Sequence, residues 1–232
     1  MKPRRAVALL LAAFALAGCG GAERNGTATL WVTRDRGTVV MVDAKVAAGQ
    51  TLIRALRSKT DVETRYGGRF VQAIDGVEGS LAKRHDWFWL VNGLAGDRSA
   101  AEYRLRAGDV AWWDYRDWSR DADLAVVVGA FPEPFLHGYG GKVRPVAVEY
   151  ALPSQRDDAR ALARRLHARS VSLRGRTVAS DWNLFVLDKH AGTRFVARQR
   201  TPGGPSSPVV VRFSGDVRRL LDGAYRHRFS VP

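Results

Sequence analysis

Residues 87–93 read Trp-Phe-Trp-Leu-Val-Asn-Gly, and residues 107–113 read Ala-Gly-Asp-Val-Ala-Trp-Trp. In each segment a run of large apolar side chains lies beside residues typical of a tight turn, Asn-Gly in the first and Ala-Gly-Asp in the second. Both runs therefore predict β-strands. Because successive side chains of a strand point to opposite faces, Trp87 and Trp89 are expected on one face of a sheet and Phe88 on the other.

Further strand and helix signals lie upstream. Residues 29–33 and 38–42 are rich in β-branched side chains and flank a polar turn, which predicts an opening hairpin. Thr51 can cap a short helix over residues 52–56, and residues 70–74 predict another strand. A helix of about two turns is marginal alone, so it must pack on the sheet. It covers one sheet face, and the other apolar face must meet a second domain, a partner or a ligand.

The order of these segments resembles the transcobalamin-like C-terminal domain, a β-grasp module of vitamin B12 carriers and of many bacterial lipoproteins. The resemblance covers residues 28–118 and rests on the two quoted runs together with residues 49–56, 72–77 and 103–105. It implies an α+β fold class, with an N-terminal β-grasp domain of ubiquitin-like or SLBB-like type. It also implies binding of a small ligand rather than catalysis.

In that family the module closes over one face of a corrin ring, mainly through apolar contacts and backbone hydrogen bonds. The ligand-binding residues that the resemblance implies in this chain are Ile74, Gly76, Trp87, Phe88, Trp89, Tyr103 and Trp112. A corrinoid is the ligand that it implies, and no other cofactor is expected. Core packing is the alternative for each aromatic residue, since Trp and Phe dominate the interiors of small domains.

The N-terminus has the features of a lipoprotein signal. Three basic residues precede an apolar run over residues 6–17, which matches the core of a signal peptide and is too short to span a membrane. The run ends in Leu-Ala-Gly-Cys at Cys19, which resembles a lipobox, and Cys19 is the only cysteine. We therefore expect a signal peptide over residues 1–18, lipidation of Cys19, a tether over residues 19–27 and an extracytoplasmic, membrane-anchored protein.

The net positive charge of the chain restricts the classes of partner that it can bind. It carries 37 Lys and Arg against 23 Asp and Glu, and loss of residues 1–18 would leave 34 basic residues and a net charge of +11. Export argues against nucleic acid as the partner of this charge and favours anionic lipid, cell-wall polymer or a phosphate-bearing ligand. Compositional drift on a solvated surface is the alternative.

A second domain is predicted after the first. The apolar pattern stops near residue 118 and residues 119–123 are polar, so we expect a linker there and a small α/β domain over residues 124–232. Its predicted strands cover residues 124–128, 146–148, 182–187, 195–198 and 209–213.

Two helices and one unusual loop are expected in this second domain. Residues 154–157 fit a capping box opened by Ser154, and apolar residues then recur with helical spacing from Ala159 to Leu166. Ser214 is expected to open a last helix. Residues 135–142 contain glycines and a lysine, as a phosphate-binding loop would, but their spacing departs from a Walker sequence. A flexible loop is therefore favoured there, with phosphate binding as the alternative.

No catalytic or metal-binding residue is predicted. The five histidines lie outside any metal-binding spacing, and the single cysteine argues against a structural zinc site. The sequence thus favours a cell-surface lipoprotein that binds a small ligand, with membrane lipid and a transporter component of an uptake system as candidate partners. Two alternatives stay open: an envelope interaction module whose aromatic face docks a partner or its own second domain, and a hydrolase in the second domain.

Overall fold

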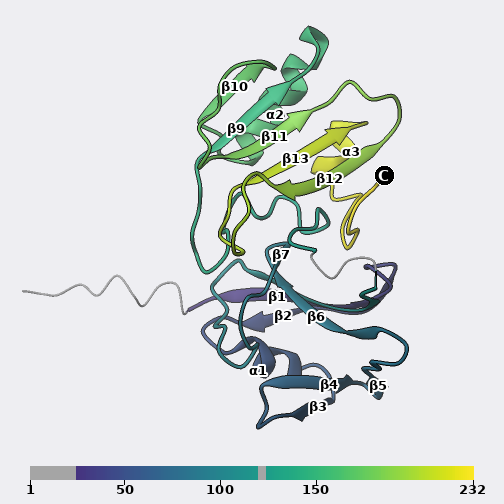
Figure 1. Cartoon of the computed structure of the whole chain (residues 1–232). Helices are drawn as coiled ribbons and strands as arrows, with labels where there is room; N and C mark the ends of the chain where they lie inside the picture. The colour runs from purple at the N-terminus through teal and green to yellow at the C-terminus, as the bar shows by residue number, and fades with distance from the viewer. Residues whose placement is uncertain (1–24, 120–123) are drawn as a thin grey trace, which may run out of the picture.

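A five-stranded mixed sheet forms the first half of the molecule. In the computed structural model, which describes residues 25–119 and 124–232, the strand order is β2-β1-β8-β6-β7 (Figure 1). The bounds are β1 Thr27–Arg34, β2 Val39–Ala47, β6 His85–Val91, β7 Leu94–Ala95 and β8 Val110–Asp117. β1 and β2 form the predicted antiparallel hairpin, β6 is antiparallel to β8, and β1 is parallel to β8. The predicted signal peptide, Cys19 and most of the predicted tether and linker lie outside the described residues.

Helix α1, Leu52–Arg57, covers one face of this sheet. The hydroxyl of Thr51 accepts a hydrogen bond from the N–H of Arg54, which confirms the predicted cap. The buried side chains of α1 share a core with Val91 and Trp113 of the sheet. A separate three-stranded sheet lies next to α1 and consists of β3 Val62–Arg65, β4 Phe70–Ile74 and β5 Val77–Glu78 (Figure 1).

The second half contains another five-stranded sheet, in the order β10-β9-β11-β13-β12. The bounds are β9 Val146–Tyr150, β10 Ser170–Leu173, β11 Asn183–Leu187, β12 Arg194–Gln199 and β13 Val209–Ser214. Only β12 runs antiparallel to its neighbour. Four of the five strands predicted for this half are thereby confirmed. The described residues form mixed sheets with few helices, which fits an α+β or a mostly-β fold, and the β-grasp assignment stays a prediction.

The helices of this half begin differently from the prediction. Pro153–Gln155 form a 3-10 turn, η1, so that Ser154 lies inside the turn and does not cap α2, Arg156–Arg165. Instead, the Gln155 side chain accepts the N–H groups of Ala151 and Leu152. Ser214 ends β13, and the carboxylate of Asp216 caps α3, Val217–Leu221. Both helices exist where their apolar spacing predicted them, because burial of one face does not depend on the type of cap.

The strand predicted over residues 124–128 is wrong, and the reason lies in the first half. The Val127 N–H donates to the Gly93 carbonyl, and the Ala95 N–H donates to the Ala125 carbonyl, so this segment runs beside β7. Val126, Val127 and Val128 are buried, and Val127 packs with Trp31 and Trp112 of the first half. An apolar run predicts burial but not the element that provides it.

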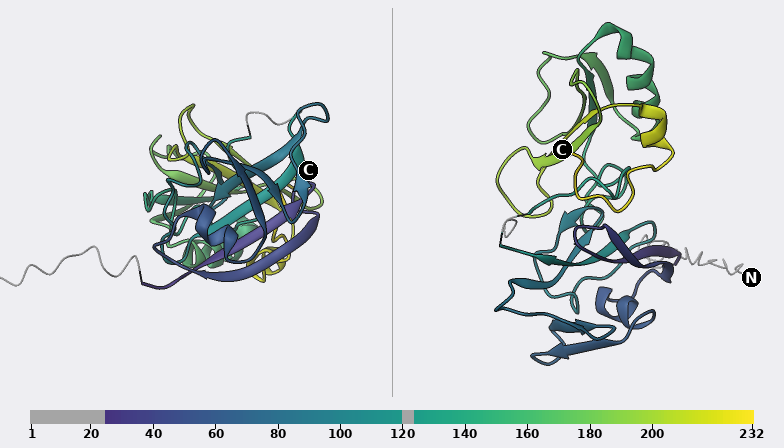
Figure 2. Two further views of the ribbon diagram at one scale, coloured as in Figure 1. Left: turned by 90° about the horizontal axis from the view of Figure 1, so that it is seen from below. Right: turned by 90° about the vertical axis from the view of Figure 1, so that its right-hand side faces the viewer.

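The sheet face opposite α1 is covered by the second half of the chain. Trp112 is fully buried there, with its ring 5.3 Å from that of Trp31 and 5.0 Å from that of Phe229. Leu90, Val127 and Ala130 complete the buried part of this cluster. Figure 2 shows the second half lying along this side of the sheet. The sequence alone leaves open whether a second domain, a partner or a ligand covers this face. The structure shows that the second half of the chain covers it.

Residues 137–142 are docked on the first half by a polar network. The Asn92 amide donates to Asp109 over 2.8 Å and to the Gly138 carbonyl over 2.6 Å. The Gly140 N–H donates to the Tyr103 hydroxyl. Gly138 and Tyr139 are buried, so the expectation of a flexible loop is corrected for this part of the segment. The turn residues Asn92 and Asp109 therefore also hold the second half.

Replacing Phe229 by Ala should lower the free energy of unfolding by about 3–5 kcal/mol, because a core aromatic is lost between the two halves. Urea denaturation followed by tryptophan fluorescence measures this change. Tyr66→Ala is the matched control, since Tyr66 is 78% exposed, and a change within about 0.5 kcal/mol is expected there. Equal effects of the two substitutions would contradict the observed cover of the Trp112 face.

Candidate functional site

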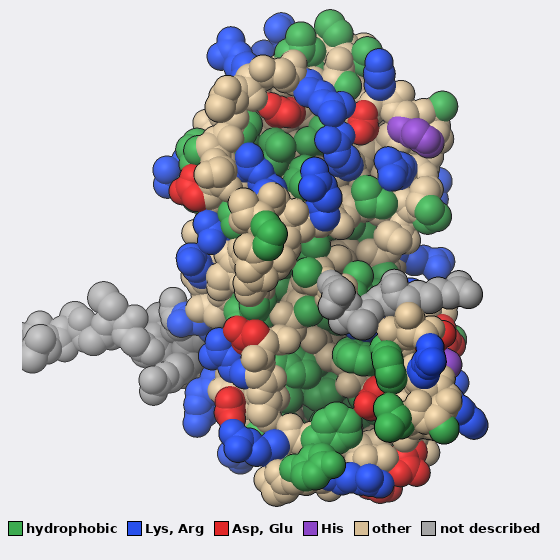
Figure 3. Space-filling view, viewed as in Figure 1, with side chains coloured by type: hydrophobic (Ala, Val, Ile, Leu, Met, Phe, Trp, Pro, Cys, Tyr) green, Lys and Arg blue, Asp and Glu red, His purple; other side chains and the backbone are tan. Residues whose placement is uncertain are grey.

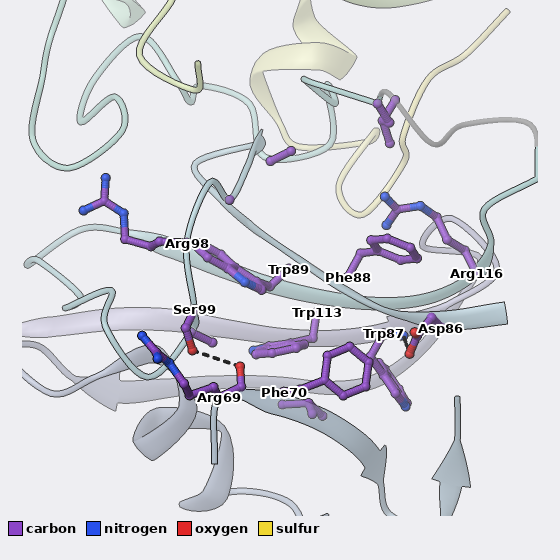
Figure 4. A pocket seen from close by; sticks show the side chains of 15 residues that line it. Arg69, Phe70, Asp86, Trp87, Phe88, Trp89, Arg98, Ser99, Trp113 and Arg116 are labelled. Atoms are coloured by element: carbon purple, nitrogen blue, oxygen red, sulfur yellow. Dashed lines mark hydrogen bonds between the residues drawn. The ribbon is translucent and has the colours of Figure 1, made fainter. Parts of the chain in front are cut away.

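A groove of about 410 Å³ opens in the first half, where β6 and β4 lie (Figures 3 and 4). Its aromatic lining consists of Phe70, Trp87, Phe88, Trp89 and Trp113. We call it the β6 groove. Figure 3 shows hydrophobic side chains exposed in this hollow. Small-molecule sites typically have volumes of about 300–1,000 Å³ and aromatic walls, so the groove has the size and surface of such a site.

The groove follows an edge of β6 that is only partly paired. β7 pairs with Leu90 and Val91 alone. The Asn92 N–H donates to the Val110 carbonyl, and because pairing alternates along an antiparallel strand, the peptide groups of Trp87 and Trp89 point away from β8. The Trp87 N–H donates to the Asp86 carboxylate, and the Trp89 carbonyl accepts from Gly96. The Trp87 carbonyl and the Trp89 N–H face outward along the same edge.

The three aromatic residues of β6 differ in their surroundings. Trp87 is 5% exposed, and its indole N–H donates to the Val77 carbonyl over 2.7 Å, which fixes the ring in the core. Trp89 and Phe88 are only half-buried. The Trp89 ring lies over Gly96, where any Cβ would come within 2.2 Å of it, so this close contact requires glycine. Trp89 and Phe88 therefore supply the accessible ring surface.

The charged lining of the groove is mainly cationic. Arg69, Arg98 and Arg116 line it together with one acid, Asp86 (Figure 4). Arg116 lies 4.2 Å from the centre of the Phe88 ring, a cation–π contact. Arg69 pairs with Glu102, and Arg98 pairs with Asp97. Exposed pairs of this kind contribute about 0–1 kcal/mol, so a ligand with acceptor groups can compete for these guanidinium groups.

Two carboxyl groups at the groove have shifted pKa values. Burial raises the pKa of Asp86, and the hydrogen bond from the Trp87 N–H opposes this shift. The hydrogen bond from Arg98 lowers the pKa of Asp97, which also accepts the Tyr139 hydroxyl over 2.7 Å. Asp97 thus stays ionised beside the groove and ties its rim to the second half of the chain.

The structure brings three of the seven predicted ligand-binding residues together in the groove: Trp87, Phe88 and Trp89. Ile74 and Trp112 are fully buried in the interior and present no surface to a ligand, which corrects their assignment as contacts. Tyr103 is buried and accepts a hydrogen bond from Gly140, so it holds the docked segment. Gly76 lies in the β4–β5 turn, outside the groove.

Sequence reasoning missed several groove residues. Trp113 could have been found, because it is opposite Trp89 in the β6–β8 pairing and shares its face. Arg98 and Ser99 come from the loop after β7 and carry no periodic signal.

The spacing Ser-x-x-Lys, which can frame a nucleophile, occurs outside the groove at residues 80–83. There the Ser80 hydroxyl accepts a hydrogen bond from the Lys83 backbone N–H in an exposed turn.

Within residues 25–119 and 124–232, no group of three or more His, Cys, Asp or Glu side chains is arranged to hold a metal ion. The groove itself offers aromatic rings, guanidinium groups and outward peptide groups. Such a set binds flat apolar surface and hydrogen-bond acceptors.

Comparisons with known proteins give a family match and two weak structural likenesses. A family described as a domain of unknown function (DUF4430) matches residues 49–117, which include β6 and most of the groove. No curated protein matches the chain. A protein from Ruminococcus gnavus ATCC 29149 proposed to bind a metal is 19% identical, with a TM-score of 0.35, and the match covers 40% of this chain and 98% of that one.

The second solved structure is haptocorrin in complex with Cbi, at 17% identity and a TM-score of 0.33. The match covers 39% of this chain and 25% of the haptocorrin chain. Scores of this size carry no argument about fold or ligand. The family match lies inside residues 28–118, to which the sequence resemblance was assigned.

Trp87→Phe should lower the free energy of unfolding by about 1–3 kcal/mol, because it keeps a ring in the core but leaves the Val77 carbonyl without its donor. Trp89→Phe removes an indole N–H for which no partner is recorded among the described residues, and a smaller loss is expected. Thermal and urea unfolding of both variants gives the comparison. A larger loss for Trp89→Phe would contradict the assignment of Trp87 to the core.

Proposed function

We propose that the chain binds a small, flat ligand in the β6 groove and acts as a binding protein rather than an enzyme. The observation that carries this proposal is the accessible surface of Phe88 and Trp89 beside an unpaired stretch of strand edge. Exposed aromatic surface together with outward peptide groups costs stability and solubility unless a partner uses it. The groove combines both kinds of contact in one place.

The lining favours a ligand with acceptor groups at its rim. Arg69 and Arg98 lie at the groove in exposed ion pairs, and the Trp89 N–H faces outward along the strand edge. A planar ring system could stack on Trp89 and place its acceptors on these donors. An extended peptide could use the same edge by adding a strand, and this is the alternative occupant.

A corrinoid is the specific ligand that we propose to test first. Its support is the sequence resemblance to transcobalamin-like modules, in which apolar contacts and backbone hydrogen bonds hold the ring. In the β6 groove these two kinds of contact would come from Trp89 and from the edge of β6. A β-grasp topology of the first half belongs to the same proposal.

We also propose that the protein is an extracytoplasmic lipoprotein that delivers its ligand to an uptake system. The support is the sequence around Cys19, which lies outside the described residues. No helix in the described part of the chain is long and apolar enough to cross a membrane. Two or three acyl chains on one cysteine would anchor the protein stably. The excess of basic residues would then face anionic lipid or cell-wall polymer.

The ligand experiment titrates cobalamin and cobinamide into the protein and follows tryptophan fluorescence. Binding should quench the tryptophan fluorescence. Trp89→Ala or Phe88→Ala should lower the affinity for the ligand about 5- to 150-fold, as expected for loss of an aromatic contact of about 1–3 kcal/mol. The melting temperature of each variant is measured alongside. Tyr66→Ala, an exposed aromatic outside the groove, is the matched control and should bind normally.

Two outcomes would decide against the ligand proposal. Absence of quenching by either corrinoid up to high micromolar concentration removes the corrinoid. If, in addition, the protein isolated from its native membrane carries no small molecule detectable by absorbance or mass spectrometry, the interaction module becomes the better account. Loss of folding in Trp89→Ala would instead show that this ring is structural.

Cys19→Ser should abolish acyl labelling and leave the precursor unprocessed or mislocalised, because the chain has no other cysteine to accept a diacylglyceryl group. Labelling with a radioactive fatty acid, followed by membrane fractionation, measures both effects. A membrane-anchored, acyl-labelled Cys19→Ser protein would refute the lipoprotein proposal.

A further inference from the structure

A second cavity, of about 460 Å³, lies where the two halves of the chain meet. Trp31 lines it from the first half, and Phe131, Leu136 and Leu220 line it from the second. We call it the junction cavity. It shares no lining residue with the β6 groove. Its apolar walls resemble those of small-molecule sites, and its volume lies within the same range.

A positioned imidazole lines the junction cavity. His137 Nδ1 lies 2.5 Å from Glu133 Oε1, and the His137 backbone N–H donates to Glu133 Oε2 over 2.9 Å. The Glu133 side chain is only 4% exposed, whereas that of His137 is 41% exposed. Because the carboxylate engages Nδ1, the second nitrogen, Nε2, is left for another contact. The His137 ring packs against Gly108, where any Cβ would come within 2.4 Å of Nε2, so this close contact requires glycine.

The charges around this imidazole favour an anion. Glu133 is engaged by His137, and Asp109 accepts hydrogen bonds from the Asn92 amide and the Arg106 N–H. The carboxylates of Glu133 and Asp109 are therefore already engaged in hydrogen bonds within the protein. The other charged residues of the lining are Arg165 at the end of α2 and Asp222 and Arg226 after α3. Arg226 also pairs with Asp43 over 2.8 Å, an exposed ion pair for which a ligand can compete. Arg165 and His137 supply the other positive charges of the lining, and Asp222 is its exposed acid.

We propose that the junction cavity is a second binding site, for a small amphipathic anion of the aromatic carboxylate class. The carboxylate lies on His137 Nε2, and Arg165 and Arg226 of the same lining supply further donors. The apolar body packs against Trp31, Phe131 and Leu220. This proposal does not depend on the function assigned to the β6 groove.

The hydrogen-bonded pair of Glu133 and His137, which we call the dyad, has the chemistry of an anion site rather than of a purely structural contact. The hydrogen bond with Glu133 raises the pKa of His137 above its ordinary value, and Asp109 adds to this shift. His137 therefore keeps its proton to higher pH and offers a charged donor at Nε2. A hydrogen bond between charged groups is about twice as strong as a neutral one, and the surrounding apolar wall limits competition by water.

Such a ligand would also strengthen the contact between the two halves. It would touch Trp31 and Gly108 of the first half and Phe131 and Leu220 of the second at the same time. A ligand that binds only the docked arrangement stabilises it by mass action. Binding should therefore raise the melting temperature of the whole protein.

The test uses 2-naphthoate as the probe and 2-naphthamide, its uncharged counterpart, as the matched ligand control. The full chain is purified in a non-ionic detergent, and detergent alone gives the calorimetric blank. Naphthoate should bind, raise the melting temperature and shift the ring resonances of ¹⁵N-labelled His137. The amide should bind roughly 10- to 150-fold more weakly, because it lacks the charge-assisted hydrogen bond.

Variants then separate the anion contact from folding. His137→Gln should weaken naphthoate binding by roughly the same 10- to 150-fold and leave amide binding nearly unchanged. His190→Gln, an exposed histidine outside the cavity, is the matched control. Naphthoate affinity should fall as pH rises through the raised pKa of His137, because the imidazolium is lost there. In Glu133→Gln this fall should occur at lower pH, because the group that raises the pKa of His137 is gone.

Three results would overturn the proposal. The first is equal affinity for naphthoate and naphthamide, and the second is naphthoate binding that His137→Gln does not change. The third is absence of any shift of the His137 resonances at millimolar naphthoate below pH 6.5. If His137→Gln lowers the melting temperature without affecting the ratio of the two affinities, the dyad only holds the loop.

Discussion

The central strands of the first sheet carry apolar side chains on both faces, so both faces have to be removed from water. α1 covers the face of Trp113, and segments of the second half cover the face of Trp112. Full burial of one large apolar side chain contributes roughly 1.5–3 kcal/mol. Separation of the halves would expose Trp31, Trp112 and Phe229 together. The two halves are therefore held by the sheet face itself, and both cavities take their shape from this arrangement.

The open edge of β6 is what remains after both faces are covered. β7 ends after Ala95, and the Trp89 ring occupies the space over Gly96. Unpaired strand edges are normally shortened or charged, because they recruit other chains. Here the neighbouring arginines and the hydrogen bond between Asp86 and the Trp87 N–H reduce that risk without closing the edge. An edge that is protected but still accessible is suited to binding a ligand.

The sequence could predict the elements but not all of their contacts. The alternation in β6 correctly separates Trp87 and Trp89 from Phe88, and the cap at Thr51 marks the start of α1. The burial of Trp112 depends on Phe229, more than a hundred positions later, and no local pattern reports such a contact. Similarly, the β6 groove needs Arg98 from a loop without periodicity. The secondary-structure element of a residue and the strand face on which its side chain lies follow from the local sequence. The segments that cover this face, and the pockets between them, are set by the tertiary fold.

One segment of the chain connects the two cavities. His137 lines the junction cavity, and two residues later the hydroxyl of Tyr139 donates to Asp97, whose carboxylate also holds Arg98 at the β6 groove. Gly138 between them is fixed by Asn92. Asp97 thus contacts both a residue of the β6 groove and the segment that carries His137. Any coupling through this path must be reciprocal, because each ligand changes the affinity for the other by the same factor. Residues 137–139 are therefore the segment that connects the two proposed sites, and coupling between these sites would require a change in this segment.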